Sequence, residues 1–203
     1  MSIRAVIFDM GGVLVRTEDR TPRTQIAERL GLTYDELSAL IFDSQSARQA
    51  MKGEITAAEH WEAIQEALCV PQDEFGKVRL DFWGGDTLDE NLVNYLRDLR
   101  PQYKTALLSN AWDDLRQMIE EEWKIDDAFD EIIISAEVGL VKPDPRIYQR
   151  IIVEMDVLSA EAVFVDDFPE NVEAARLQGL QAIQFNDPDQ ALRDLSQLLE
   201  TNK

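Results

Sequence analysis

Short apolar runs alternate with longer amphipathic segments along most of this chain. The short runs lack the strict alternation of a half-exposed strand, and such runs suit strands that are buried on both faces. The amphipathic segments between them suit the helices of right-handed βαβ crossovers. The pattern therefore predicts an α/β fold with a doubly wound, Rossmann-like parallel sheet, whose ligand binds beyond the carboxyl ends of the strands. The five candidate strands are residues 3–9, 104–109, 131–135, 162–166 and 180–185.

Residues 16–85 break this rhythm, because they contain four successive helical patterns and no strand pattern. We therefore expect a core built from residues 1–15 and 86–203, with residues 16–85 as an all-helical insertion. Thr21 before Pro22, Thr33 and Thr56 are candidate helix caps, and Gly31 is a candidate helix stop. The four helical patterns are residues 21–31, 33–44, 56–69 and 71–83.

Gly84 and Gly85 fall where the chain returns from the insertion to the core. Glycine absorbs large backbone changes, so the pair is either a hinge or a static turn before the next helix.

Composition limits the partners of the protein. The 203 residues are 45% hydrophobic and 30% charged, which is ordinary for a soluble globular protein. The formal charge of −20 opposes binding to nucleic acid or to an anionic membrane surface, so we expect neither as a partner. A small anion can still bind where a cation compensates its charge locally.

The chain shows no secretory or membrane-spanning pattern. The apolar N-terminal segment contains Arg4 and Asp9 and fits a buried strand better than a signal peptide, and no apolar run is long enough for a membrane span. The single cysteine, Cys69, has no intrachain partner, which favours the reducing cytoplasm. Its neighbours in ALCV are apolar, so we expect a buried thiol.

Polar groups follow the predicted strands at four places. Asp9 ends the first strand, where its carboxylate is held on a rigid element and can act as a nucleophile. Ser109 and Asn110 end a second strand just before a helical pattern, where free amide groups favour an anion. An ordinary strand-end aspartate and simple helix capping would explain each of these features taken alone.

The other two places supply a cation and a carboxylate pair. Lys142, within GLVKPDP, is a natural counterion for phosphate and for Asp9 in so acidic a protein. Asp166 and Asp167 are adjacent at the end of another strand, and a cation is the simplest compensation for their repulsion. Magnesium prefers such oxygen ligands. We expect Asp167 to bind it directly and Asp166 either to bind it or to orient Lys142.

These segments, IFDMGG, LLSNA, LVKPDP and VFVDDFPEN, resemble the haloacid dehalogenase superfamily of aspartate-nucleophile hydrolases over nearly the whole chain. The resemblance implies that Asp9 is the nucleophile and that the insertion is a helical cap which closes over the site and selects the substrate. It also implies a Mg²⁺ cofactor. The implied metal ligands are Asp9, the Gly11 carbonyl, Asp166 and Asp167, the implied phosphate contacts are Gly11, Gly12, Ser109, Asn110 and Lys142, and the implied catalytic residues are Asp9 and Lys142.

One departure affects the chemistry. Most phosphatases of that superfamily carry a second aspartate two residues after the nucleophile, where this chain has Gly11. Glycine cannot give a proton to the leaving oxygen or take one from water. Glu18, Asp19 and His60 are the candidate replacements. His60 is the only histidine and lacks a partner with metal-ligand spacing, which argues against zinc and fits an ordinary residue of the insertion.

The sequence thus predicts a magnesium-dependent phosphatase that acts through an aspartyl phosphate on a small phosphorylated metabolite. The overall resemblance, including the segment KGEIT at 52–56, is closest to the sugar-phosphate phosphatases of that superfamily that also lack the second aspartate, so a sugar phosphate is the first expectation. The alternatives are a 2-haloacid dehalogenase, against which the aspartate pair argues, and a phosphate-binding scaffold with little turnover. We expect a monomer or homodimer. Trp112, Arg48 and Lys52 are open between ligand contacts and ordinary structural positions.

Overall fold

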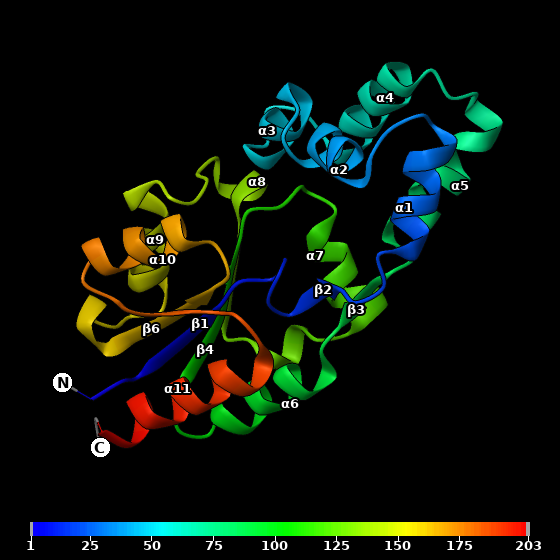
Figure 1. The fold of residues 1–203 in the computed structure, drawn as a ribbon. Coiled ribbons are helices and arrows are strands. Elements are labelled where there is room, and N and C mark those ends of the chain that lie inside the picture. The colour runs from blue at the N-terminus through cyan, green and yellow to red at the C-terminus, as the bar shows by residue number, and fades with distance from the viewer. Residues whose placement is uncertain (1, 202–203) are drawn as a thin grey trace.

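A five-stranded parallel sheet forms the centre of the molecule in the computed structural model, which describes residues 2–201 (Figure 1). All five predicted strands are present and form a doubly wound sheet, so the fold class is confirmed. The first strand of the sheet lies between the second and the fourth in chain order, which places a change of chain direction at its carboxyl end. The strands, in spatial order, are β5 (Glu131–Ile134), β4 (Lys104–Ser109), β1 (Ala5–Phe8), β6 (Ala162–Asp166) and β7 (Gln181–Gln184).

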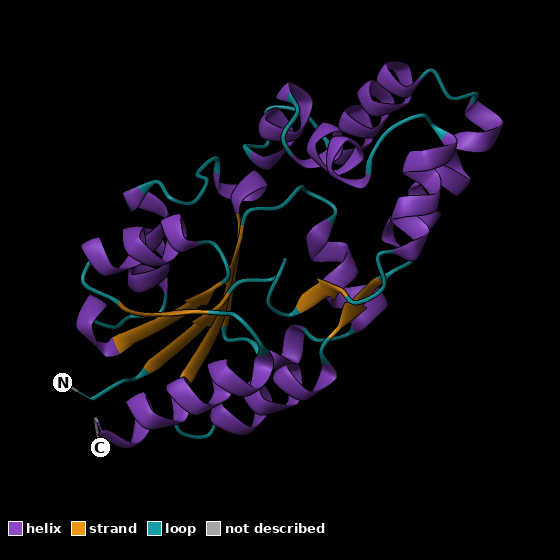
Figure 2. Ribbon diagram, viewed as in Figure 1, coloured by secondary structure: helices purple, strands orange, loops and turns teal. Residues whose placement is uncertain are grey.

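Helices cover both faces of the sheet, as the buried apolar runs require (Figure 2). Successive side chains of a strand point to opposite faces. Val6 and Phe8 therefore belong to one apolar cluster, with α6 and α11, while Ala5 and Ile7 belong to the other, with α9 and α10. These helices are α6 (Glu90–Leu99), α9 (Pro145–Glu154), α10 (Pro169–Leu177) and α11 (Pro188–Thr201).

Five helices between β1 and β4 pack around an apolar core of their own, and we call them the cap. Thr33 and Thr56 each form a capping box, as expected, and Gly31 has a φ of +74° just after the first cap helix ends. Thr21 is not a cap, because the helix already begins there and Arg20 precedes it. The cap helices are α1 (Thr21–Arg29), α2 (Tyr34–Phe42), α3 (Gln45–Met51), α4 (Ala57–Leu68) and α5 (Gln72–Trp83), of which α3 was not predicted.

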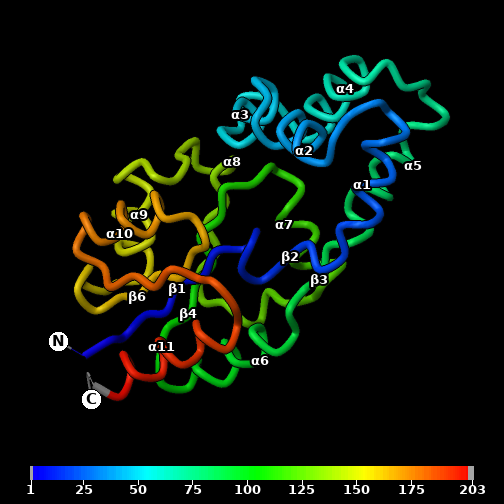
Figure 3. Tube along the Cα trace, in the orientation of Figure 1, coloured from blue at the N-terminus to red at the C-terminus, as the bar shows by residue number. Residues whose placement is uncertain are grey.

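Two antiparallel linker strands, β2 (Val15–Thr17) and β3 (Asp86–Leu88), connect the core to the cap and lie side by side (Figure 3). A Cβ at Gly85 would overlap the carbonyl of Asp19, so glycine is needed there for a close approach of the two linkers. This contact favours the static role of Gly85 over a hinge. The proposed division at residues 16 and 85 lies at this ribbon.

Shorter elements complete the core. They are α7 (Leu115–Gln117), a π-helical segment (Met118–Trp123), two 3-10 turns (Asp126–Ala128 and Ser159–Glu161) and α8 (Ser135–Val138). Within residues 2–201, no helix has the length and apolar character needed to cross a membrane. Cys69 is exposed rather than buried, because it ends α4 in a left-handed conformation that turns its side chain outward.

Candidate active site

The carboxyl ends of three neighbouring strands bring the predicted polar groups together. Asp9 follows β1, Ser109 ends β4 and Asp166 ends β6, and the registers of these strands align their ends. All three side chains are buried, as is Lys142 from the loop after α8. In Figure 2 these strand ends point toward the cap. The location agrees with the general rule for ligand sites in open α/β sheets.

Lys142 lies between two carboxylates at the centre of this cluster. Its Nζ is 2.8 Å from Oδ1 of Asp9 and 2.7 Å from Oδ2 of Asp166, and it donates a third hydrogen bond to the Leu108 carbonyl at 2.9 Å. Its side chain is only 1% exposed. The ammonium group is therefore fully engaged and fixed in position, which a solvated surface lysine would not be.

Burial and charge shift the titration of this ion triad in opposite directions. Burial raises the pKa of Asp9 to about 7, with Lys142 opposing the shift and Asp166 adding to it. Burial alone would lower the pKa of Lys142, but Asp9 and Asp166 outweigh it and raise the pKa above its ordinary value. The lysine is thus charged at neutral pH, and the site carries more negative charge than it can compensate alone.

Asp166 is saturated by protein donors. Its Oδ2 binds Lys142, its Oδ1 accepts from the Phe168 amide at 2.8 Å, and the Asn171 side chain lies 3.1 Å from both oxygens. Tyr148, which reads as a core aromatic in the sequence, donates to the Asn171 carbonyl at 3.0 Å. Of the two expected roles of Asp166, these contacts favour orientation of Lys142 over direct metal binding.

Asp167 is the carboxylate that has an oxygen without a hydrogen-bond partner. Its Oδ1 is buried, and no group within residues 2–201 hydrogen-bonds to it. Burial raises the pKa of Asp167 to about 6, and the charge of Asp166 adds to the shift. Oxygens of Asp9, Asp166 and Asp167 all lie within 4.8 Å of one another. A half-buried carboxylate with one buried, unpartnered oxygen beside two further carboxylates fits a divalent cation bound through oxygen.

The two glycines after Asp9 differ in what they permit. Gly12 has a φ of +79°, and a Cβ there would lie 2.5 Å from Cγ of Asp167, so only glycine leaves room for that carboxylate. Gly11 is exposed, and a Cβ there would meet nothing within 4 Å. Steric crowding is therefore not the reason that position 11 is a glycine.

Asn110 holds the lysine loop in place. Its Nδ2 donates to the Lys142 carbonyl at 2.9 Å, and its Oδ1 accepts from the Lys142 amide at 2.7 Å. These two bonds indicate a positioning role, whereas we expected a phosphate contact. Ser109 is 3% exposed and ends β4 beside Asp9, where its hydroxyl can serve a ligand. The helix expected directly after Asn110 begins only at Leu115.

The candidate replacements for the missing acid-base group are engaged elsewhere. Glu18 pairs with Arg16, and Asp19 accepts from the Thr21 amide. His60 is fully buried inside the cap, where its Nδ1 is 2.9 Å from the Ser46 hydroxyl, and burial lowers its pKa. None of these contacts joins them to the triad. His60 is therefore an interior residue of the cap, as its place in an amphipathic helix indicates.

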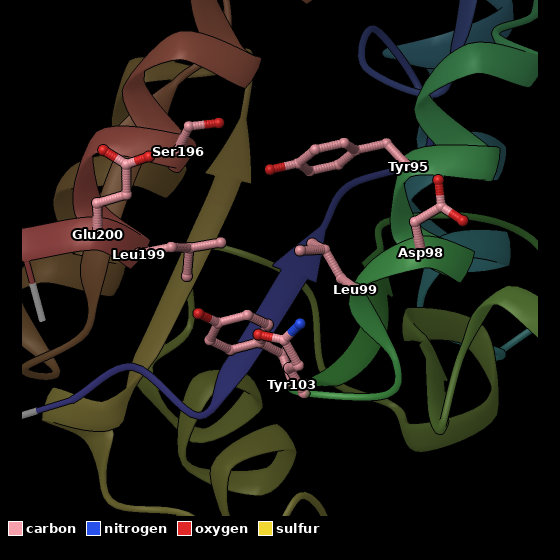
Figure 4. Close-up of a pocket in the computed structure, with 8 residues that line it drawn as sticks. Tyr95, Asp98, Leu99, Tyr103, Ser196, Leu199 and Glu200 are labelled. Carbon is pink, nitrogen blue, oxygen red and sulfur yellow. The ribbon is translucent and has the colours of Figure 1, made fainter. Parts of the chain in front are cut away.

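A shallow pocket elsewhere is not part of this cluster. It lies between α6 and α11, where Tyr95 and Leu99 face Ser196 and Leu199 (Figure 4). Tyr103, at the start of β4, also lines it, so the pocket sits at the amino ends of the strands. It contains none of the groups predicted from the sequence.

Fold and cluster together define a hydrolase-type α/β core with a buried aspartate, lysine and aspartate triad under a helical cap. Residues 3–179 match the model of the haloacid dehalogenase-like hydrolases, and the chain belongs to this family of hydrolases.

Two curated relatives match nine-tenths or more of the chain. A sesquiterpene phosphatase of Aspergillus oryzae is 30% identical, covering 98% of this chain and 97% of that protein. A D-ribitol-5-phosphate phosphatase of Bacteroides thetaiotaomicron is 27% identical, covering 90% and 91%. The chain is also 30% identical to pig bifunctional epoxide hydrolase 2 over 99% of its own length, but spans only 40% of that protein.

The fold is shared with a solved family enzyme of Bacteroides thetaiotaomicron in complex with magnesium and inorganic phosphate. The TM-score is 0.76 at 22% identity, and the match covers 94% of this chain and 99% of that one. At this identity the likeness concerns the fold.

Proposed function

We propose that the protein is a magnesium-dependent phosphatase that hydrolyses a small phosphomonoester through an aspartyl phosphate on Asp9. One observation carries the proposal: Asp9 is fixed through a single oxygen. Its Oδ1 accepts from the Met10 amide at 2.7 Å and pairs with Lys142. No hydrogen bond recorded for residues 2–201 engages Oδ2, so that oxygen is free to attack phosphorus.

The metal requirement rests on the donor set. Asp9 and Asp167 would hold the ion, with the Gly11 carbonyl as the further ligand that family resemblance implies. Bound Mg²⁺ would neutralise charge on the phosphoryl oxygens. The buried, unpartnered Oδ1 of Asp167 supports this assignment, because an anion without a partner is costly to bury.

The remaining groups act on the phosphoryl oxygens and on the nucleophile. Lys142 orients Asp9 and favours its ionised form, against the effect of burial on its pKa. The charge of Lys142 also opposes the negative charge that develops in the transition state. The hydroxyl of Ser109 can donate to a phosphoryl oxygen. Asn110 and Asp166 hold Lys142 from two sides, so the ammonium group needs no reorganisation during the reaction.

The substrate is a small phosphorylated metabolite, and a sugar or sugar-alcohol phosphate is our first proposal. The Bacteroides relative, named for D-ribitol 5-phosphate, supports it. The Aspergillus relative acts on a sesquiterpene, which makes an apolar prenyl phosphate the natural contrast in any substrate panel.

The test is phosphate release from a panel of sugar, sugar-alcohol and prenyl phosphates, with and without Mg²⁺. We expect magnesium-dependent release by the wild type and loss of at least about a thousandfold in Asp9→Asn, because the amide cannot form the covalent intermediate. Asp73→Asn changes an exposed aspartate of α5 and is the matched control.

Each other outcome points to one alternative. Chloride release from 2-chloropropionate without metal, and no phosphate release, would establish the dehalogenase. Magnesium-dependent phosphate binding without turnover of any ester would establish the binding scaffold.

A further inference from the structure

We call the loop of Ser109 and Asn110 the phosphate-binding loop, after its proposed role. Trp112 and Asp113, which follow it, belong to the core by sequence but dock on the cap. Trp112 is 7% exposed and lies in the apolar core of the cap. Its ring centroid is 4.4 Å from that of His60 and 5.7 Å from that of Trp61, both on α4. Only Asn110 and Ala111 separate this anchored side chain from Ser109, so a shift of the cap moves the loop that carries the serine.

Asp113 makes a directional bond across the same boundary. Its Oδ1 accepts a hydrogen bond of 2.7 Å from the amide of Ala57, the first residue of α4. This amide is one of the helix-terminal donors that have no partner inside the helix. The capping box satisfies the amides of Thr56 and Glu59 but not that of Ala57, which is left for a group from outside the cap.

A second contact between cap and core lies close in sequence to the loop that carries Lys142. Gly53, after α3, packs so closely on Ala136 of α8 that a Cβ would overlap the Ala136 carbonyl. The chain then runs from α8 to Lys142. Ser135 hydrogen-bonds to both the amide and the carbonyl of Ala111, at 3.0 and 3.1 Å, which joins the two loops. The cap thus rests on the loops that hold Ser109 and Lys142.

We propose that Asp113 is a positioning residue, which couples docking of the cap to phosphate binding by capping α4 from the phosphate-binding loop. The proposal rests on the function proposed above. Because coupling between two sites is reciprocal, an anion that orders the Ser109 loop strengthens the Asp113 cap, and a docked cap strengthens anion binding. Loss of the bond lowers the fraction of molecules in the competent form and weakens apparent substrate affinity by the same factor.

Three variants test the coupling. Asp113→Ala removes the bond across the boundary, Asp113→Asn keeps an accepting oxygen, and Thr56→Ala removes a bond at the same helix end but within the cap. We expect Asp113→Ala to raise KM about tenfold, with kcat changed less than about twofold, because saturating substrate restores the docked form. Asp113→Asn should recover most of the loss. Thr56→Ala should weaken the fold about as much as Asp113→Ala while leaving KM near the wild-type value.

A second measurement does not depend on turnover. Hydrogen exchange of the first-turn amides of α4 is followed with Mg²⁺ alone and with Mg²⁺ plus inorganic phosphate. We expect phosphate to slow exchange at Ala57 severalfold in the wild type and in Thr56→Ala, and to have no effect there in Asp113→Ala.

Two results overturn the coupling. One is equal KM in Asp113→Ala and Thr56→Ala, and the other is no phosphate effect on wild-type exchange at Ala57. A protein that turns over no ester, yet shows the exchange pattern above, retains the coupling and refutes only the phosphatase. If the protein hydrolyses esters but the Asp113→Ala and Thr56→Ala variants are indistinguishable, the phosphatase is supported and the coupling is refuted.

Discussion

Gly11→Asp should increase the rate of phosphate release. The position is exposed, its φ lies outside the left-handed region, and a Cβ there would meet nothing within 4 Å. An aspartate therefore fits without backbone strain. It would stand two residues after the nucleophile, where most related phosphatases carry an acid that protonates the leaving oxygen and then activates water.

The size of the gain follows from this chemistry. General acid-base help is typically worth about a hundredfold to ten-thousandfold, and we expect the lower end, because no neighbour is arranged to orient the new carboxylate. A hundredfold gain is about 2.7 kcal/mol of transition-state stabilisation. The gain depends on the leaving group: an alkyl phosphate needs the proton, whereas p-nitrophenyl phosphate leaves as a stabilised anion and should gain only a few-fold.

Initial rates with an alkyl phosphate and with p-nitrophenyl phosphate, at saturating Mg²⁺, measure both effects. Gly11→Asn is the matched control, since it has the same shape but no acid. Gly12→Ala should lose activity, because its Cβ would displace Asp167. Equal rates for the Asp and Asn variants on the alkyl phosphate would refute the reasoning, and would place the missing acid-base step in water or in another residue.

Two further predictions concern the buried charges. Burial raises the pKa of Asp9 to about 7 and that of Asp167 to about 6, so the metal-free fold loses stability as pH rises from about 4 to 7. Because Mg²⁺ competes with the bound protons, it should raise Tm more at pH 8 than at pH 5. Asp167→Asn should remove this difference. Lys142→Met should lower the free energy of unfolding by about 3–5 kcal/mol at pH 8, because it strands Asp9 and Asp166 without a counterion. In urea denaturation that deficit should shrink at pH 5, where Asp9 is protonated because its pKa is raised to about 7. An equal deficit at both pH values would mean that packing rather than charge is lost.

Local pattern was enough for the elements that bury apolar surface on every side. The three central strands β4, β1 and β6 follow from this, whereas the edge strands β5 and β7 are only partly buried. The capping boxes at Thr33 and Thr56 were also predictable, because each depends on residues within one turn. The ribbon of β2 and β3 could not be found in this way. Its strands are three residues long, and its pairing is fixed by contacts distant in sequence, including the bond between Thr17 and Asp86.

For the site residues, the sequence predicts the positions along the chain but not the side-chain contacts. The positions of Asp9, Lys142 and the aspartate pair follow from strand ends and motif spacing, but the direction of each side chain depends on partners that only the folded chain supplies. Asn110 illustrates the difference: its place after β4 suits an anion contact, whereas both polar atoms of its side chain bind the Lys142 backbone. Tyr148 gives no signal in the sequence, because a buried tyrosine on an amphipathic helix reads as core.

The charge balance of the cluster sets an order for binding. Three carboxylates lie within 4.8 Å of one another beside the ammonium group of Lys142, so the cluster carries an excess of negative charge once Asp9 and Asp167, whose pKa values are raised to about 7 and about 6, lose their protons. A divalent cation matches that charge, whereas a phosphate dianion entering first would be repelled by buried anions that water screens poorly. The affinity for phosphate should therefore depend strongly on whether Mg²⁺ is bound. The affinity for Mg²⁺ should depend only weakly on bulk ionic strength. Since the cap contacts the loops that hold Ser109 and Lys142, we expect metal binding to favour phosphate capture and, through these loops, the docked cap.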